Sequence, residues 1–594
     1  MLGEDVWLFP KDNGWGRENS LVRKPSVCER VVGVAPKFDH YWVFSEVESA
    51  LKEWSKTYPG LMTLESAGKS GEGRDIYAVT LTNKSTGDPS EKPAFYLDGN
   101  HHAGEVTGSM ISLYTIKYLL ENHGRDEKVT RILDRCTVYA IPRVSPDGAE
   151  VYLTTPETLR SVPRFYPYPN PEEKEGLYPA DIDGDGEILL MRVKDPAGEW
   201  KVSPKDKRAL VRRRPDEEGG TYYRVYTEGL IRDYEGGEIK PAPAKWGLDL
   251  NRNYPYGWAP DTRQPGAGEF PLSEPETRAV AEFIVKHPNI SLAFTYHTTG
   301  GVILRVPGSH PASKSPQRDI QALIAIGEMG TEETGYPCIP CFEDFTGGNA
   351  EGFSTGAFDD WLYEHRGILS YTVETWNQAQ RAGVQNWPRR PKTPAEQDED
   401  FLKLLAWNDR ELGGRGFEDW RPFEHPQLGC VEIGGWHNKF VVQNAPPLFL
   451  EAECHKNAMF SLRAMACLPR VEVFKVSAKA VSDGVWEVSA VVKNMGFLPT
   501  FGSYQAQAVG KAQELEAEVA GPEIEVVGKA RKNIGHLEGR SGQTGGFGAG
   551  FFRGGSAVRE TRVTWTVKGK KGSQVTVKVW GPRAGMSRAS LVLE

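Results

Sequence analysis

Strand-like and helix-like segments alternate between residues 44 and 373, and this pattern constrains the fold more than any other feature of the chain. Apolar runs typical of strands, such as Ala94 to Leu97, Thr137 to Ile141 and Ile368 to Val373, are separated by helical patterns. Strands that alternate with helices form a mostly parallel sheet covered on both faces. We therefore expect an α/β domain with a mostly parallel, helix-flanked mixed sheet and functional residues at the carboxyl ends of its strands.

The chain has 594 residues, too many for one ordinary domain, and its character changes along the sequence. We expect a lead-in at residues 1–37 and a catalytic domain at residues 38–468. Residues 155–245 are rich in Pro, Gly and charge and interrupt that domain as an inserted region. Residues 469–594 alternate with period two and contain few helical patterns, which predicts an all-β sandwich domain without visible chemistry.

Charge and hydropathy exclude several classes of partner. The net charge of −9 disfavours nucleic acid and anionic membranes, and no apolar run is long enough to span a bilayer. Residues 1–30 lack the apolar core of a signal peptide. The seven cysteines fit a reducing compartment, and Cys338 and Cys341 are interpreted as two free thiols. We expect a cytoplasmic protein, with secretion left open and the oligomeric state undetermined.

A histidine and a glutamate three residues apart follow the strand-like run that ends at Leu97. His102 and Glu105 can bind one zinc ion if a third ligand arrives from elsewhere and water takes the fourth position. The His-x-x-Glu pattern alone also arises by chance. Three further segments at strand-like ends strengthen it: Asp249 to Asn253, Tyr296 to Thr298 and Thr372 to Glu374.

Together the four segments resemble the zinc carboxypeptidases of the carboxypeptidase A/B family over roughly residues 38 to 465. The resemblance implies the zinc carboxypeptidase sheet and a metallocarboxypeptidase, a hydrolase that removes C-terminal amino acids from peptides. It implies one Zn²⁺ ion held by His102, Glu105 and His297. It assigns Glu374 as the general base that takes a proton from a zinc-activated water. Asp249 matches the carboxylate that orients a zinc-bound histidine.

The resemblance also implies substrate-binding residues. Asn251 and Arg252 match the pair that holds the free C-terminal carboxylate of the substrate, which a guanidinium can bind bidentately. Asp359 matches a position where an acid marks a pocket for C-terminal Lys or Arg, although it can instead cap a turn before Trp361. The expected partner is a peptide with a free C-terminus, and neither nucleic acid nor a membrane.

A further arginine of the family polarises the scissile carbonyl, and it should lie between the Pro146-Asp147-Gly148 turn and Asn251. We expect it to be Arg192. The alternatives are Arg212, Arg213 and Arg214, and any of these can instead be a solvated surface charge.

The inserted region also contains a candidate calcium loop. Asp181, Asp183 and Asp185 have the spacing of the first calcium-loop ligands, with the turn glycine after them. The glutamate that completes such a loop is replaced by Arg192. The segment therefore either binds Ca²⁺ with the help of another acid or is a tight acidic turn.

Two departures from the family leave the substrate open. The stretch from Ala350 to Thr355 lacks the family's mobile tyrosine, and no long inhibitory propeptide precedes the domain, so we expect an enzyme made active. One alternative is a zinc acylase or amidohydrolase acting on small N-acyl amino acids or cell-wall peptides, because an acyl amino acid also has a free carboxylate. A non-catalytic peptide-binding module is a third interpretation, and the retention of all three ligands and Glu374 argues against it.

Overall fold

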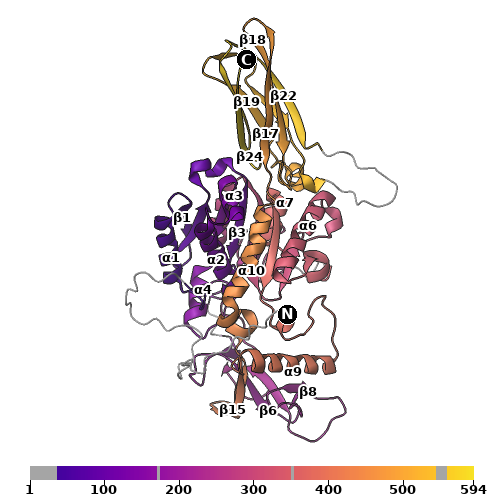
Figure 1. Ribbon diagram of the computed structural model, residues 1–594. Helices are drawn as coiled ribbons and strands as arrows, with labels where there is room; N and C mark the ends of the chain where they lie inside the picture. Colours follow the sequence, from indigo (N-terminus) through magenta and orange to yellow (C-terminus); the bar gives the residue numbers. More distant parts are fainter. Residues whose placement is uncertain (1–36, 170–173, 349–353, 543–557) are drawn as a thin grey trace, which may run out of the picture.

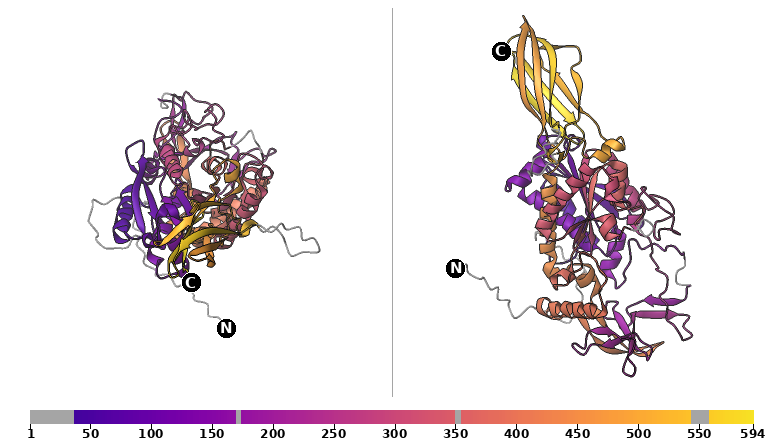
Figure 2. Two further views of the ribbon diagram at one scale, coloured as in Figure 1. Left: turned by 90° about the horizontal axis from the view of Figure 1, so that it is seen from above. Right: turned by 90° about the vertical axis from the view of Figure 1, so that its right-hand side faces the viewer.

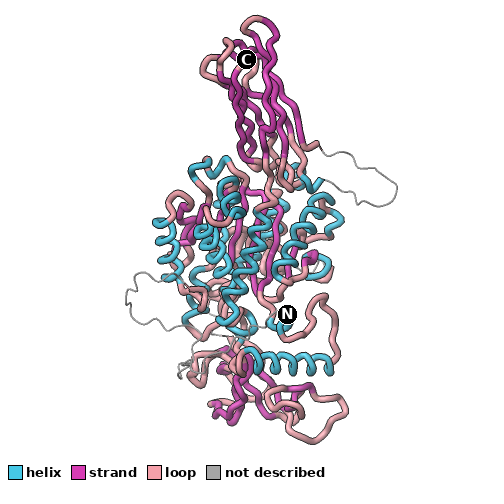
Figure 3. The backbone as a smooth tube through the Cα atoms, viewed as in Figure 1, coloured by secondary structure: helices cyan, strands magenta, loops and turns pink. Residues whose placement is uncertain are grey.

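A computed structural model of the chain describes residues 37–169, 174–348, 354–542 and 558–594. A central α/β body carries a small sheet with a helix at one end and a β-sandwich at the opposite end (Figures 1 and 2). Colouring by secondary structure separates the sandwich, built almost only of strands, from the mixed central body (Figure 3). The predicted lead-in at residues 1–37 falls outside the described residues except for its last residue.

The central body is built on an eight-stranded mixed sheet. Its middle strands β4, β3, β11 and β14 run parallel to one another, whereas the pairings β1–β2, β2–β4 and β12–β14 are antiparallel. This confirms the predicted mostly parallel mixed sheet. In spatial order the strands are β1 (Met62–Lys69), β2 (Asp75–Leu81), β4 (Thr137–Ile141), β3 (Ala94–Gly99), β11 (Ile290–Thr298), β14 (Leu369–Thr375), β12 (Val302–Arg305) and β13 (Cys338–Pro340).

Helices cover both faces of this sheet because successive strand residues point to opposite faces. In β3, Phe95 and Leu97 belong to a core shared with α1, α2, α6 and α10, whereas Tyr96 belongs to a second core shared with α5 and α7. The helices of the body are α1 (Phe44–Thr57), α2 (Val106–Asn122), α3 (Glu127–Arg135), α4 (Pro146–Thr154), α5 (Pro275–Lys286), α6 (Gln317–Thr334), α7 (Phe358–Arg366), α8 (Gln378–Arg381) and α10 (Pro447–Met465).

The inserted region forms its sheet only together with a later segment of the chain. The six strands, in spatial order, are β15 (Phe417–His425), β16 (Gly429–Trp436), β6 (Leu190–Lys194), β9 (Tyr223–Thr227), β7 (Trp200–Val202) and β8 (Leu210–Arg212). A separate pair joins β5 (Gly176–Pro179) to β10 (Gly229–Arg232). Helix α9 (Pro394–Glu411) packs on the six-stranded sheet through Leu405. The hairpin β15–β16, which completes this sheet, lies outside the range 155–245 that was predicted for the insertion.

The C-terminal residues form two four-stranded sheets, which agrees with the predicted all-β sandwich. Alternate residues such as Val488, Ala490 and Val577 point into a shared apolar core between the sheets. One sheet contains β17 (Val471–Ser482), β18 (Val485–Asn494), β22 (Glu560–Gly569) and β20 (Ile524–Val527). The other contains β21 (Arg531–Gly535), β19 (Leu515–Ala520), β23 (Gln574–Gly581) and β24 (Gly585–Val592), and the short helix α11 (Tyr504–Ala508) lies at the base.

The sandwich docks on the amino ends of the central strands. Arg583 donates to the carbonyls of Arg366 at 2.6 Å and Gly367 at 2.7 Å, just before β14. The carboxyl ends of the parallel strands therefore face the opposite end of the body, where the small sheet lies (Figure 1). In the described part of the chain, no helix is both long and apolar enough to cross a membrane.

Candidate metal centre and its surroundings

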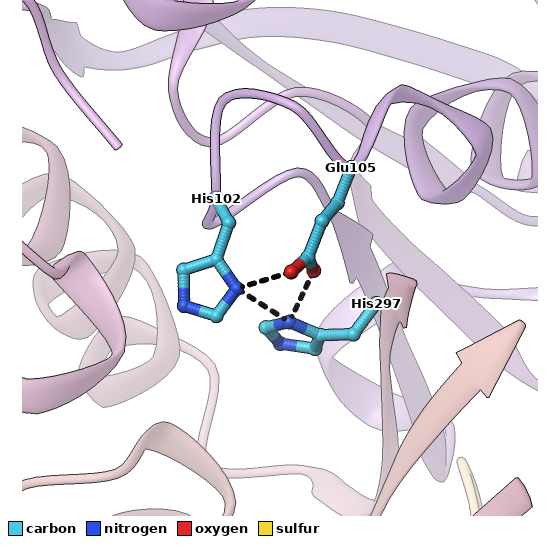
Figure 4. A group of neighbouring side chains, drawn as sticks. All are labelled: His102, Glu105 and His297. Atoms are coloured by element: carbon cyan, nitrogen blue, oxygen red, sulfur yellow. Dashed lines mark hydrogen bonds and ion pairs between the residues drawn. The ribbon is translucent and has the colours of Figure 1, made fainter. Parts of the chain in front are cut away.

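His102, Glu105 and His297 meet at the carboxyl ends of the adjacent parallel strands β3 and β11 (Figure 4). The two carboxylate oxygens of Glu105 each lie 2.8 Å from an imidazole nitrogen, Nδ1 of His102 and Nδ1 of His297. The two Nδ1 atoms are 3.1 Å apart. All three side chains are buried, so the structure brings together the three residues that the sequence selected.

Local backbone geometry places these ligands. Asn100, in the left-handed region at φ 68°, turns the chain after β3, and its Nδ2 donates to the carbonyl of His102 at 2.7 Å. A Cβ on Gly108 would lie 2.5 Å from the carbonyl oxygen of Tyr296, so only glycine lets α2 approach β11 this closely. That approach brings Glu105, immediately before α2, to His297.

The donor set fits a zinc ion. Nε2 of His102 lies 3.0 Å from Oδ1 of Asp249, so a metal ion on Nδ1 would leave the Nε2 proton to donate to that carboxylate, which only accepts. Burial would raise the pKa of Glu105, but attraction to His102 and His297 outweighs burial and holds that pKa below its ordinary value. Two imidazole nitrogens and one carboxylate that converge in a buried place are a ligand set that zinc prefers.

Glu374 lies directly opposite His297 in the register of β14 and β11. The residue is partly exposed, but its Oε2 atom is enclosed and has no hydrogen-bond partner among the described residues. Burial raises the pKa of Glu374 to about 7, and repulsion by Glu105 adds to the rise. A carboxyl group of this pKa with a free oxygen beside a metal site is suited to exchange protons near neutral pH.

The structure does not bring Arg192 to this site, so the prediction for the carbonyl-polarising arginine is corrected. Arg192 lies on β6 in the small sheet, where its Nε donates to Glu432 at 2.9 Å and its guanidinium stacks on Tyr223 and Trp420. The alternatives belong to the same inserted region: Arg212 stacks on Trp200, Arg213 stacks on Tyr222, and Arg214 follows β8.

Arg160 is the arginine that reaches the candidate site. Its Nε donates to Oδ2 of Asp249 at 2.8 Å, and its Nη1 lies 3.6 Å from Oε1 of Glu105. The backbone carbonyl of Arg160 also accepts from the N–H of Ala103, next to His102. Arg160 was not among the arginines predicted for this role, although it lies inside the region 155–245 where that arginine was expected. Its position in that interval does not single it out, because several other arginines, such as Arg164 and Arg208, lie in the same interval.

Asn251 and Arg252 follow Asp249 in a short turn next to the same site. Oδ1 of Asn251 accepts from the backbone N–H of Phe358 at 2.8 Å, which ties the turn to α7. Nη1 of Arg252 donates to the carbonyl of Asn251 at 2.6 Å. Within the described residues no carboxylate pairs with the Arg252 guanidinium, so it keeps donors for a ligand. The predicted role of the pair as a carboxylate clamp stays a prediction.

Asp359 is buried, and both of its carboxylate oxygens have protein partners. Oδ1 accepts from the backbone N–H of Asp360 at 2.9 Å, and Oδ2 accepts from Oγ1 of Thr372 at 2.8 Å. Asp359 lies in the first turn of α7, whose N-cap is Ala357, so its side chain ties the helix to β14 and does not cap a turn before Trp361. The pocket-floor role stays a prediction.

The acidic loop of the insertion holds a guanidinium from β15. Arg421 pairs with Asp183 at 2.6 Å and with Asp185 at 2.5 Å, while Asp181 accepts two backbone N–H groups of the loop. The acids that lie close enough together to share an ion are Asp181, Asp183 and Glu228, and Asp185 is not one of them. Because Arg421 already supplies positive charge here, calcium binding is not supported.

Among the other singled-out residues, Cys338 and Cys341 are both free thiols, as interpreted from the sequence. The stretch that lacks the family's mobile tyrosine, Ala350 to Thr355, lies outside the described residues except for its last two positions.

Comparison with known proteins places these features in a wider group. The zinc carboxypeptidase family matches residues 47–389, and a domain of unknown function matches residues 470–592. Carboxypeptidase O of Bos taurus is 22% identical over 388 residues, covering 63% of this chain and 82% of that protein. The crystal structure of carboxypeptidase A from Helicoverpa armigera has a TM-score of 0.36 and 18% identity, covering 63% of this chain and 74% of that chain.

A higher identity is found over a shorter segment. Carboxypeptidase D of Homo sapiens is 35% identical over 118 residues, which are 20% of this chain and 8% of that protein. Because this match spans so little of carboxypeptidase D, the activity and substrate of the whole chain stay proposals.

Proposed function

Because this chain belongs to the zinc carboxypeptidase family, we propose that it is a metallocarboxypeptidase that hydrolyses the C-terminal peptide bond of peptides. The observation that carries this proposal is the convergence of His102, Glu105 and His297 with Glu374 at the ends of neighbouring strands. A binding module without catalysis has no need of a carboxyl group with an unpartnered oxygen beside a metal site. The proposed substrate is a peptide with a free C-terminus.

His102, Glu105 and His297 would hold one zinc ion through the two Nδ1 atoms and the carboxylate. When bound, zinc supplies a Lewis acid that polarises a carbonyl oxygen and lowers the pKa of a water molecule. Asp249 holds the tautomer of His102, and the backbone N–H of Thr298 donates to Oε2 of Glu105 at 3.1 Å. These bonds keep the ligands oriented, which such outer partners commonly do at metal sites.

Glu374 would act as the proton carrier. With a pKa of about 7, its carboxylate can take a proton from water onto Oε2 and then release that proton to the leaving amine. The two transfers restore the ionised carboxylate at the end of the reaction.

Two arginines would bind the substrate. Burial would lower the pKa of Arg160, but attraction to Asp249 and Glu105 outweighs burial, so the guanidinium stays charged beside the metal ligands. It can therefore stabilise negative charge that develops on the scissile carbonyl. Arg252 and Asn251 would hold the terminal carboxylate, since Arg252 has no carboxylate partner in the described chain.

A zinc acylase acting on small N-acyl amino acids or cell-wall peptides is the second candidate. It would use the same metal site, and Arg252 would bind the free carboxylate of an acyl amino acid equally well. The observation that favours it is the position of the small sheet, at the end of the body toward which the parallel strands point (Figure 1). A sheet at this end would narrow the access to the site and so favour small substrates.

Release of the terminal residue from matched peptides tests the proposal. Each peptide is supplied with a free or an amidated C-terminus, and Glu374→Gln serves as the inactive control. Cleavage of the free-acid forms alone supports a carboxypeptidase. Hydrolysis of N-acyl amino acids without peptide cleavage establishes the second candidate in its place.

A further inference from the structure

The segment after β14 returns to the loop that follows His297. Nε1 of Trp387 donates to the carbonyl of Gly300 at 2.8 Å, shortly after His297 in the chain. Gly300 has no side chain, and the point that its Cβ would occupy lies 3.7 Å from Cβ of Glu374 and 3.9 Å from Cζ2 of Trp387. The indole ring therefore lies in the immediate neighbourhood of Glu374.

Trp387 supports a stacked guanidinium. The Arg389 guanidinium carbon lies 4.5 Å from the Trp387 ring centre and 4.7 Å from the Phe345 ring centre. The Phe345 and Trp387 rings are tilted by only 23° from one another, with centres 6.0 Å apart. Stacking of this kind holds a guanidinium plane while leaving its N–H edges free to bind.

Arg389 differs from its cationic neighbours in having no carboxylate partner among the described residues. Arg390 pairs with Glu396 at 2.7 Å, and Lys392 pairs with Asp400 at 2.6 Å, both across to α9. The only hydrogen bond of the Arg389 side chain runs from Nη1 to the carbonyl of Phe345, at 3.5 Å, in the described part of the chain. Its charge is therefore available to a ligand.

Arg389 also lies where a ligand has room. It lines two hollows of about 490 Å³ and 450 Å³, one bounded by Phe345 and Trp387 and the other by Arg390 and Lys392. Among the described residues that line the second hollow, none is acidic. The first has Glu343 and Asp344 on its border, so a cationic ligand is the competing occupant there.

From these contacts we propose that Arg389, which stacks against Phe345 and Trp387 near Glu374, is a specificity-determining residue that binds an acidic side chain of the substrate. The inference rests on the proposed function and adds a substrate class to it: peptides with Asp or Glu close to the scissile bond. Arg252 would hold the main-chain carboxylate, and Arg389 would hold a second, side-chain carboxylate. The planar fork of a guanidinium suits such a carboxylate, which it can bind through two parallel hydrogen bonds.

The charge of Arg389 reaches the proposed base. Burial and Glu105 raise the pKa of Glu374, whereas Arg389 is among the cations that lower it. An acid bound by Arg389 would therefore lie within electrostatic range of the reacting groups, where its position matters for turnover.

The test compares peptides that share one C-terminal residue and differ at the two preceding positions, where each carries Asp, Asn or Lys. Binding to the zinc-loaded Glu374→Gln protein is measured by calorimetry, and kcat/KM is measured with the unmodified protein. We expect an Asp peptide to be favoured over its Asn counterpart on the order of tenfold, as for one charge-assisted hydrogen bond that is partly exposed. Arg389→Gln should abolish that ratio both in binding to the Glu374→Gln protein and in kcat/KM, whatever change it makes to the turnover common to all the peptides.

Arg390→Gln is the matched control. It removes the same charge from the next residue in the chain, whose guanidinium is already paired with Glu396. The proposal is overturned if the Asp-to-Asn ratio survives Arg389→Gln, if Arg390→Gln lowers it equally, or if Lys peptides bind best. Failure of the proposed function gives a different result. In that case no peptide is cleaved, yet the binding ratio in the Glu374→Gln protein still reports on Arg389.

Discussion

Glu374 owes its proposed role to its surroundings more than to its residue type. It lies opposite His297 in the sheet register, and Glu105, whose negative charge repels it, holds both histidines. The pKa of a glutamate carboxyl group in water lies well below 7, but burial raises the pKa of Glu374 to about 7. Glu374 can therefore both accept and release a proton near neutrality.

This pKa predicts an acid limb in the activity. Only the ionised carboxylate accepts a proton, so kcat/KM should rise with pH through the pKa of Glu374 and be lost below it. The pKa of about 7 is that of the metal-free site, and attraction to a bound dication lowers it, so the midpoint should lie at or below 7. The pH profile of kcat/KM for the zinc-loaded enzyme measures this. A midpoint well above 7 would contradict the assignment of Glu374.

Asp360 provides the control for that profile. Burial, followed by repulsion from Asp359, raises its pKa to about 7 as well, yet its Oδ1 accepts from the backbone N–H of Gly308 and not from a metal ligand. The Asp360→Asn variant should keep the same acid limb.

We expect Arg160 to act in catalysis and Arg192 to stabilise the small sheet, and variants of the two residues distinguish these roles. Arg160→Ala should lower kcat/KM on the order of 10²–10³-fold at unchanged zinc content, as when a donor to the developing oxyanion is lost. Arg192→Ala should lower Tm, because Glu432 loses its partner, while kcat/KM changes little. Kinetics, zinc analysis and thermal unfolding of both variants check this. Equal losses of activity would remove the distinction.

The contrast between these arginines also shows what the sequence can and cannot predict at the residue scale. His102 and Glu105 were predictable from their spacing after a strand-like run. His297 followed from the resemblance to the zinc carboxypeptidases, with its strand-end position in support. The arginine was not predictable, since nothing in a linear pattern tells which of several arginines folds back toward Asp249. The backbone hydrogen bond between Arg160 and Ala103 is a tertiary contact across 57 residues, and no local propensity encodes it.

At the scale of elements, the end of β14 is held in an unusual conformation. Trp376, two residues after Glu374, has φ at 61°, which is strained for a residue with a large side chain. Its backbone N–H donates to the hydroxyl of Tyr336 at 2.9 Å and to Oε1 of Glu453 at 3.2 Å. Glu453 is buried on α10, so a helix far along the chain fixes the turn that follows the proposed base.

We therefore expect Glu453→Ala to disturb catalysis without removing the metal. The variant leaves the buried N–H of Trp376 with a weaker set of partners, at a stability cost of about 1–3 kcal/mol. Relaxation of the strained turn should then move Glu374, lowering kcat more than it raises KM, at normal zinc content. Glu453→Gln, which keeps an acceptor oxygen, should recover part of kcat. An unchanged kcat in the Ala variant would show that the turn is held by other contacts.

The insertion marks the limit of sequence reasoning at this scale. Helices and strands of the central body follow from hydrophobic periodicity, and the strand-like runs Ala94 to Leu97 and Thr137 to Ile141 lie in β3 and β4. The small sheet pairs β6 with β16, which lies more than 200 residues later in the chain. Short strands of mixed polarity carry too little pattern to reveal such a pairing.

At the scale of the whole molecule, the sandwich and the candidate site occupy opposite ends of the central strands. Beyond Arg366 and Gly367, Arg583 donates to the carbonyls of Phe501 at 3.3 Å and Pro288 at 3.4 Å. Burial lowers its pKa to about 10, which still leaves it charged at neutral pH. One side chain thus joins the start of β11, the start of β14 and the base of the sandwich.

Removing this side chain should loosen the sandwich and leave the chemistry intact. In Arg583→Ala each carbonyl left without a donor costs about 1–3 kcal/mol if water does not replace the guanidinium. We expect a lower Tm and faster proteolysis at the junction near residue 470, with kcat/KM on a short peptide nearly unchanged. Arg588→Ala is the control, since Arg588 is exposed on the neighbouring strand β24. A loss of kcat/KM with the sandwich still docked would mean that the two ends of the strands are coupled, and the sandwich would then be part of the catalytic unit.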